Sequence, residues 1–240
     1  MKKMIIPIAV TALILNSCTS LQQVANQLPQ ILETGGVGQT QIAAGLKEAL
    51  QQGIDKQVVN LTKTDGFYNN SLVKIGLPSE LQKVEKTLRD IGLGSLADEG
   101  IKSLNKAASN AVKEATPIFV NAITSMTISD ATAILMGNKN AATQYLQKTT
   151  KTALYSKFNP VIKSSFTKVG ADKVWNNIIT KYNAIPTVKK VNPDLTDHVT
   201  QQALAGVFTM IEKEEANIRT NVSARSTNVL KTVFAMQDKK

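Results

Sequence analysis

The sequence is poor in the residue types that staple small folds together. Its 240 residues contain one cysteine, Cys18, and aromatic residues make up only 5% of the chain. A single cysteine excludes an intramolecular disulfide framework, so stability must come from packing. Ala, Leu, Lys and Gln are plentiful, and this composition favours helices over strands.

Histidine is scarce as well, because His198 is the only one. A Ser-His-Asp site would have to use His198, and the sequence points to no Ser and Asp partners for it. No His-Glu-x-x-His segment and no Cys/His cluster is present that would bind zinc. We expect His198 to be a surface residue near a helix start, and we expect no cofactor and no metal.

Arginine is rare in a chain whose net charge is +10. Only Arg89, Arg219 and Arg225 are arginines, and the lysines are scattered without a dense run. Sequence-specific nucleic-acid sites depend on arginine forks and stacked aromatic rings, so we expect no nucleic-acid partner. A solvated lysine surface is the favoured interpretation, and attraction to anionic lipid head groups is the second.

Long apolar runs are also missing after residue 18, so the sequence predicts no transmembrane helix. Before that point, Lys2 and Lys3 precede an apolar stretch from Met4 to Leu15, which is typical of an export signal. Leu15 and Ser17 ahead of Cys18 resemble the lipobox of bacterial lipoproteins. By that resemblance, Cys18 receives a diacylglycerol, including palmitate-like chains, and becomes the mature N-terminus.

Two other interpretations of Cys18 stay open. In the first, Cys18 is a buried core thiol, as free cysteine often is. In the second, residues before Cys18 form an ordinary cleavable signal peptide and the cysteine carries no lipid. Asn16, two residues before the cysteine, is unusual in a lipobox and keeps the second open. If the lipid is present, two or three acyl chains anchor the protein stably at a membrane surface that it does not cross.

The mature chain is expected to be an all-α, compact multi-helix bundle of about seven to nine helices. Residues 1–18 are the lipoprotein signal peptide, residues 19–38 a flexible tether rich in glycine at its end, residues 39–236 a single helical domain and residues 237–240 a frayed tail. Apolar residues at steps of three or four predict a first helix from Gln39 to before Asp65-Gly66. A second helix over about 80–90 is capped by Ser79.

Prolines divide the middle of the predicted bundle. Pro117 lies inside a long alanine-rich helical pattern that starts at Ser95, and we expect it to kink or divide that helix. Ser129-Asp130 caps a short helix that ends near Met136. A helix from Asn140 to about Phe158 is followed by another apolar segment that starts at Pro160.

The last third is the most regular. A helix after Gly170 carries Trp175, which we expect to be a core anchor. Asp194 or Thr196 caps a broad amphipathic helix, and Asn221 caps a final helix that buries Val222.

One group of polar residues on the last helices is a candidate site. Glu215 and Arg219 are four residues apart in the favourable order for an ion pair, and Arg225 is expected to fold back toward the same carboxylates. We favour a salt-bridge clasp that locks the last two helices, and the alternative is a cation or polar-ligand site that Asp65 or Asp130 joins. The group consists of Glu212, Glu214, Glu215, Arg219 and Arg225.

Three further polar residues have structural and functional interpretations. Asp65 precedes a glycine in a turn, and Asp130 lies at a helix start, where a carboxylate complements the helix dipole. Asn105 lies on or beside an apolar helix face. We expect it to be a buried amide that bridges to a loop, with a ligand contact as the alternative.

The chain resembles the bacterial family called domain of unknown function 4197 over about residues 38–236. His198 and Val222 depart from the family pattern, which usually has an aromatic residue and a proline at these places. The resemblance implies an exported, largely helical protein, and the family has no assigned activity. It rests on Gly45-Leu46-Lys47-Glu48-Ala49-Leu50, Asp65-Gly66-Phe67, Asn105-Lys106-Ala107-Ala108, Ser129-Asp130-Ala131, Ala141-Ala142-Thr143, Glu214-Glu215, Ile218-Arg219 and Arg225.

The function expected from the sequence is a non-enzymatic binding or scaffold module at the cell envelope, facing the periplasm or an equivalent space. Its partner is a protein, an envelope polymer or an apolar ligand bound in a groove between alanine-rich helices. The alternative is an enzyme with an acidic, metal-assisted site between helices.

Overall fold

A computed structural model describes residues 38–90, 92, 94–169, 171–184, 186, 190 and 194–238. Cys18, the predicted signal peptide and the predicted tether up to residue 37 lie outside the described residues, as do Lys239 and Lys240 and most of the connection over residues 185–193.

The described part of the chain is all-α, as predicted. It contains nine α-helices and one short 3-10 helix, and no strand. The helices are α2 (Gln39–Thr62), α3 (Ser79–Asp90), α4 (Gly94–Val112), α5 (Ala115–Thr124), α6 (Ile128–Leu135), α7 (Ala141–Val169), α8 (Ala171–Asn183), α9 (Thr196–Thr220), η1 (Val222–Ala224) and α10 (Asn228–Asp238).

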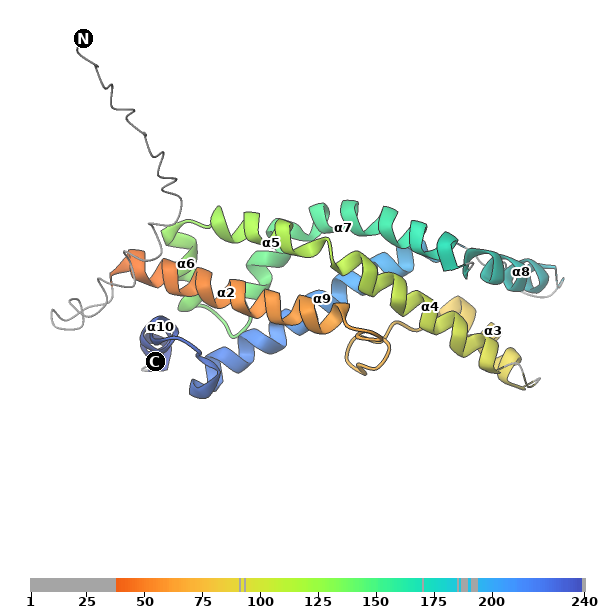
Figure 1. Cartoon of the computed structure of the whole chain (residues 1–240), viewed down its shortest axis with the longest axis horizontal. Helices are drawn as coiled ribbons and strands as arrows, with labels where there is room; N and C mark the ends of the chain where they lie inside the picture. Colours follow the sequence, from red (N-terminus) through yellow and green to blue (C-terminus); the bar gives the residue numbers. More distant parts are fainter. Residues whose placement is uncertain are drawn as a thin grey trace, which may run out of the picture.

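The longest helices run side by side and give the bundle an elongated shape (Figure 1). α7 packs against both α9 and α4, while α2 packs against α5, α6, α9 and α10. The short helices α6 and α10 lie at one end of the bundle, and α3 and α8 lie at the other end (Figure 1).

Small residues let the central helices approach closely. Ala97, Ala107, Ala108 and Ala111 of α4 are almost completely buried in the core. Trp175 of α8 is 2% exposed and packs on Gly100, where a Cβ atom would lie 2.5 Å from the indole ring. Trp175 is therefore the core anchor that the sequence predicts.

Two prolines behave differently from each other. The predicted division near Pro117 is confirmed, because α4 ends at Val112 and α5 begins at Ala115. Pro117 lies in the first turn of α5, where the missing N–H would have no partner in the helix. The predicted break before Pro160 is wrong, because α7 runs through it to Val169.

α7 continues through Pro160 because its core stripe continues. Leu154, Phe158, Ile162 and Phe166 are all buried, and they follow one another at steps of four. A proline inside a helix costs about 3 kcal/mol, and burial of one such side chain contributes about 1.5–3 kcal/mol. Burial of the stripe on both sides of the proline therefore exceeds the penalty.

The caps of the middle helices differ in part from the predicted ones. Thr127, and not Ser129-Asp130, caps α6: its hydroxyl accepts from the Asp130 N–H, and the Asp130 carboxylate accepts from the Thr127 N–H. Ser79 is the first residue of α3. At the start of α9, the N-cap residue is Leu195 and not the predicted Asp194 or Thr196, although the Asp194 carboxylate accepts a hydrogen bond from the Thr196 N–H.

The end of the chain corrects three predictions. Asn221 caps the short helix η1 by accepting from the Ser223 N–H, and α10 begins seven residues later. Val222 is consequently 57% exposed and not buried. The tail does not fray at residue 237, because α10 extends through Asp238.

Candidate functional site

The polar group on α9 lies on the buried side of that helix. Glu214, Glu215 and Arg219 are all buried. Because Glu215 and Arg219 are separated by one helical turn, their side chains meet: Arg219 Nη2 lies 2.9 Å from Glu215 Oε1, and Arg219 Nε donates to the same oxygen at 2.9 Å. We call Glu214, Glu215, Arg219 and Arg225 the α9 clasp.

The carboxylate of Glu215 holds the beginning of α7. Its Oε1 accepts from the Ala142 N–H at 3.0 Å, and its Oε2 accepts from the Thr143 N–H at 2.8 Å and from the Thr143 hydroxyl at 2.7 Å. The first N–H groups of a helix have no partner inside it and carry partial positive charge. The buried carboxylate of Glu215 accepts hydrogen bonds from these N–H groups, and its negative charge complements their partial positive charge.

The guanidinium of Arg219 holds the end of α6 in the complementary way. It donates to the carbonyl oxygens of Ile134 at 2.8 Å and Leu135 at 3.0 Å, and to Gln237 Oε1 at 2.7 Å. The last carbonyls of a helix are its negative end. One ion pair on α9 therefore joins the end of α6, the start of α7 and the last turn of α10.

Arg225 has a different role from the predicted one. It does not reach the carboxylates of α9 and instead donates to the carbonyl oxygens of Ile218 and Arg219, which close α9. Its other hydrogen bonds are with the carboxylate of Asp238, at 2.5 and 2.8 Å. The Arg225 guanidinium lowers the pKa of Asp238. Arg225 thereby fixes the last turn of α10, which explains why residues 237 and 238 are ordered.

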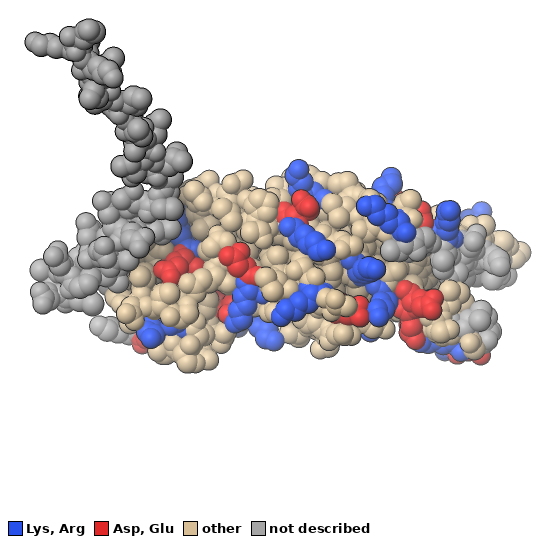
Figure 2. All heavy atoms as spheres, in the orientation of Figure 1, with Lys and Arg blue, Asp and Glu red and all other residues tan. Residues whose placement is uncertain are grey.

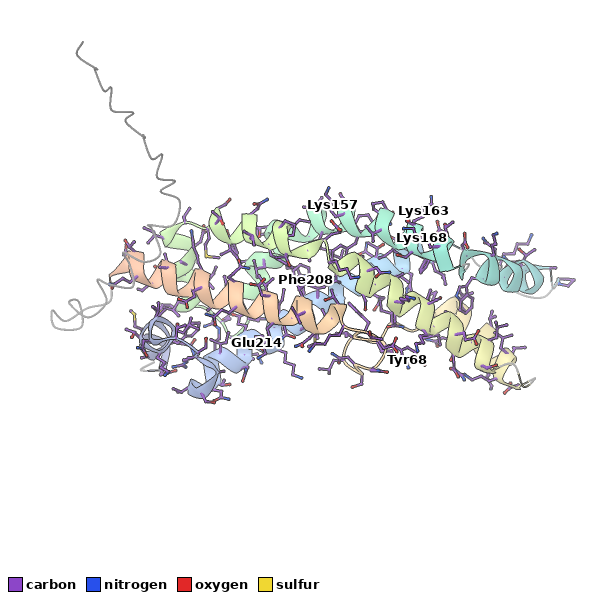
Figure 3. The ribbon with its side chains drawn as sticks, in the orientation of Figure 1. Tyr68, Lys157, Lys163, Lys168, Phe208 and Glu214 are labelled. Atoms are coloured by element: carbon purple, nitrogen blue, oxygen red, sulfur yellow. The ribbon has the colours of Figure 1, made fainter. Side chains whose placement is uncertain are left out.

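The other two acidic residues of the group point elsewhere. Glu214 accepts from Lys56 Nζ at 2.6 Å and from Gln57 Nε2 at 2.9 Å, so it ties α9 to α2 (Figure 3). Glu212 is exposed and accepts one hydrogen bond, from Asn140 Nδ2 at 3.2 Å. Glu212 therefore stands outside the buried network.

Asp65 and Asp130 do not join the α9 clasp. Asp65 has φ of 56° in the turn after α2, and its carboxylate lies 3.1 Å from Lys102 Nζ. Asp130 belongs to the capping box of α6, where the hydroxyl and N–H of Thr127 lower its pKa. The predicted acidic site that would unite these residues with Glu215 is not formed.

Asn105 is the buried amide that the sequence predicts. It is 1% exposed, accepts from the Ile75 N–H at 2.8 Å, and donates to the carbonyl oxygens of Ile75 and Ile101 at 2.8 Å each. It thus pairs with both backbone groups of Ile75 in the loop between α2 and α3. Each of its polar atoms is occupied by the protein itself.

His198 lies in the first turn of α9, and its Nε2 is 2.9 Å from the carbonyl oxygen of Gly76. No group of three or more His, Cys, Asp or Glu side chains within the described ranges is arranged to hold a metal ion. Among these same residues, no single helix is long and apolar enough to cross a membrane. The pair α5 and α6, whose axes are bent by 103° at the break between them, reaches the length and apolar composition of a span only when the two helices are taken together.

Cavities near these residues are small or open. An apolar cavity of about 20 Å³ lies between α2, α9 and α10, beside Glu215 and Arg219. A surface hollow of about 300 Å³ between α6 and α7 includes Asp130 and Tyr145, and burial raises the pKa of that tyrosine. A third hollow, of about 240 Å³, lies between α7, α8 and the start of α9 and includes Lys163 and Trp175.

A comparison with protein families matches residues 36–235 to the family described as protein of unknown function (DUF4197). The chain belongs to this family. No curated protein and no solved structure matches it. Membership therefore establishes kinship over most of the chain and assigns no activity.

Two of the stretches by which the chain resembles the family meet in space. Glu214-Glu215 of α9 contacts Ala141-Ala142-Thr143 at the start of α7 through the hydrogen bonds of Glu215. Sequence reasoning named Glu215, Arg219 and Arg225 but missed Thr143 as a partner of Glu215, Gln237 as a partner of Arg219 and Asp238 as a partner of Arg225. The sequence contained one signal for Thr143, because its stretch and the Glu214-Glu215 stretch both belong to the family pattern. It contained no signal for Gln237 and Asp238 of α10.

Proposed function

We propose that this protein is a lipid-anchored, non-enzymatic binding or scaffold module of the bacterial envelope. The anchor is Cys18, on the strength of the export signal and lipobox-like residues before it. The helical domain that follows faces the periplasm or an equivalent space and presents its surface to a partner.

One observation carries the preference for a binding module over an enzyme: the carboxylate of Glu215 is fully used by the fold. Its two oxygens accept from two backbone N–H groups, one hydroxyl and one guanidinium. A general base or a metal ligand needs a lone pair that substrate or metal can reach. Glu215 offers none, so the acidic group of α9 supports architecture.

The partner is expected on the outer surface of the bundle. The alanine face of α4 is buried in helix packing, and the apolar cavity between α2, α9 and α10 has a volume of about 20 Å³. Such a volume holds about one water molecule and no larger ligand. A protein, an envelope polymer or a membrane surface fits this geometry better than an enclosed apolar ligand.

Mass spectrometry of the protein isolated from bacterial membranes tests the anchor. We expect a mature chain that begins at Cys18 and carries a diacylglycerol and an acyl chain, and we expect Cys18→Ser to release the protein from membranes. An intact signal peptide, or an unmodified thiol at Cys18 in the membrane fraction, would contradict the anchor.

Calorimetry separates the binding module from the acidic enzyme. Titration of the domain with Ca²⁺, Mg²⁺ and Mn²⁺ should give no binding heat, and Glu215→Gln should change only thermal stability. Binding heat that Glu215→Gln abolishes and the exposed control Glu212→Gln retains would favour the enzyme. Crosslinking in living cells, with Cys18→Ser as the mislocalised control, then identifies the partner.

A further inference from the structure

α7 is a helix of one charge sign. The chain has no acidic residue between Asp130 and Asp172, and α7 lies wholly inside that interval. All of the lysines on α7 are exposed. They are Lys148, Lys151, Lys157, Lys163 and Lys168.

These lysines are not neutralised by ion pairs. Among the salt bridges of the described residues, none includes a lysine of α7. Asp130 lies close enough to Lys148, and Asp194 close enough to Lys163, for the lysines to contribute to the lowered pKa of each carboxyl. Lys151, Lys157 and Lys168 take part in none of the salt bridges of the described residues, whereas Lys163 shares a surface hollow with Asp172 and Asp194.

Lys157, Lys163 and Lys168, which we call the basic face of α7, occupy its second half. They lie along the outer side of the bundle, where basic side chains follow one another with few acidic ones between them (Figures 2 and 3). Lys157 and Lys168 lie on one flank of the buried stripe of Phe158, Ile162 and Phe166 and Lys163 lies on its other flank, so the three lysines share the exposed half of the helix. Core packing thus fixes the direction in which this face points.

We propose that the basic face of α7 docks on anionic lipid head groups, so that the bundle lies along the membrane to which it is tethered. This proposal rests on the proposed function, because the anchor at Cys18 places the domain at a membrane. Lysine ammonium groups on flexible stems suit a diffuse anionic surface, since they act as hydrated point charges without directional geometry. α7 has no arginine to form the forks that read a nucleic acid, and its two phenylalanines, Phe158 and Phe166, are buried in the core and not free to stack on bases.

The length of the chain permits this placement. Twenty residues separate Cys18 from α2, and they can span at most about 70 Å. α7, with 29 residues, is about 43 Å long. The tether can therefore let the whole helix reach the bilayer plane. Because the anchor keeps the domain near the surface, even weak electrostatic contacts suffice for docking.

Vesicle sedimentation of protein that lacks the lipid anchor tests the proposal. The protein is the chain from residue 18 with Cys18→Ser, which keeps every described contact because these lie within residues 38–238. We expect it to sediment with vesicles of equal parts phosphatidylglycerol and phosphatidylethanolamine at low salt. It should not sediment with phosphatidylcholine vesicles, and raised salt should release it.

Two triple variants with the same net charge locate the surface. Each lysine near an anionic membrane contributes about a 5-fold gain in partitioning, so Lys157→Gln/Lys163→Gln/Lys168→Gln should bind about 100-fold more weakly. The control Lys83→Gln/Lys86→Gln/Lys231→Gln removes three exposed lysines from α3 and α10 and should bind within about 5-fold of the parent. Circular dichroism checks that both variants keep their helix content.

Three outcomes would overturn the proposal: no binding to phosphatidylglycerol vesicles, equal losses in both triple variants, or retention on a linear polyanion such as heparin without vesicle binding. Failure here leaves the anchor at Cys18 intact, because the assay uses unlipidated protein. Conversely, if mass spectrometry finds no lipid on Cys18, binding of the unlipidated protein to phosphatidylglycerol vesicles still supports docking by the basic face of α7.

Discussion

Replacement of Glu215 by glutamine should destabilise the bundle more than any other isosteric change on α9. The carboxylate offers two acceptor oxygens to the N–H groups of Ala142 and Thr143, the Thr143 hydroxyl and the Arg219 guanidinium. Glutamine has one acceptor oxygen, and its NH₂ group would face an N–H donor. It would also leave the guanidinium of Arg219 buried without a counter-charge.

Both effects have known magnitudes. A buried backbone donor without a partner costs about 1–3 kcal/mol, and removal of one member of a buried ion pair costs about 3–5 kcal/mol. Since the two costs share the same atoms, they do not add fully. We expect Glu215→Gln to lower the free energy of unfolding by about 3–5 kcal/mol, a large share of the about 5–15 kcal/mol typical of a domain.

Urea unfolding, followed by far-ultraviolet circular dichroism and by the fluorescence of Trp175, measures this loss. The matched control is Glu212→Gln on the same helix, where an exposed carboxylate makes one hydrogen bond, and the expected change is within about 0.5 kcal/mol. The double variant with Arg219→Met should lose less than the sum of the two single variants, by about 0.5–3 kcal/mol. A loss below about 1 kcal/mol for Glu215→Gln, or strict additivity, would refute the clasp.

Three further changes test other parts of the fold. Asn105→Leu leaves the loop backbone N–H and C=O that it pairs with unsatisfied, and urea unfolding should show a loss of about 2–5 kcal/mol, whereas an unchanged midpoint would show that water replaces the amide. Asp238→Asn should remove a contribution to stability that depends on pH: the pKa of Asp238 is lowered in the folded protein, so the stabilisation is complete above the unfolded value of about 3.9 and disappears as the pH falls through the lower folded value. Urea midpoints of parent and variant should therefore differ at neutral pH and converge in strong acid, and a constant difference would contradict the ion pair. Gly45→Ala places a Cβ atom 2.6 Å from a valine methyl of α10, and the melting temperature should fall by the equivalent of about 1–3 kcal/mol, while Gly76→Ala, with no atom within 4 Å of the new methyl group, should change little.

Local patterns predicted the helices well where one buried stripe decided the outcome. The stripe of Ile42, Leu46, Leu50 and Ile54 placed α2, and Asn105 was recognised because a polar residue interrupted an apolar face. Predictions failed where a short-range signal competed with packing that sequence does not show. Pro160 is a strong stop signal, yet the buried residues on both sides of it keep α7 continuous.

The role of the α9 clasp illustrates the same limit at the level of function. An acid and a base four residues apart predict an ion pair, and that pair is present between Glu215 and Arg219. The same two residues in an open cleft would have been a plausible polar site. What decides between these roles is the set of partners: backbone groups of α6 and α7, more than 70 positions earlier in the chain, take up the remaining lone pairs and N–H groups. Every residue except proline has both a backbone N–H and a C=O, so such partners leave no mark in a sequence. The residues of a candidate site can therefore be predicted locally, whereas its availability for chemistry depends on the tertiary structure.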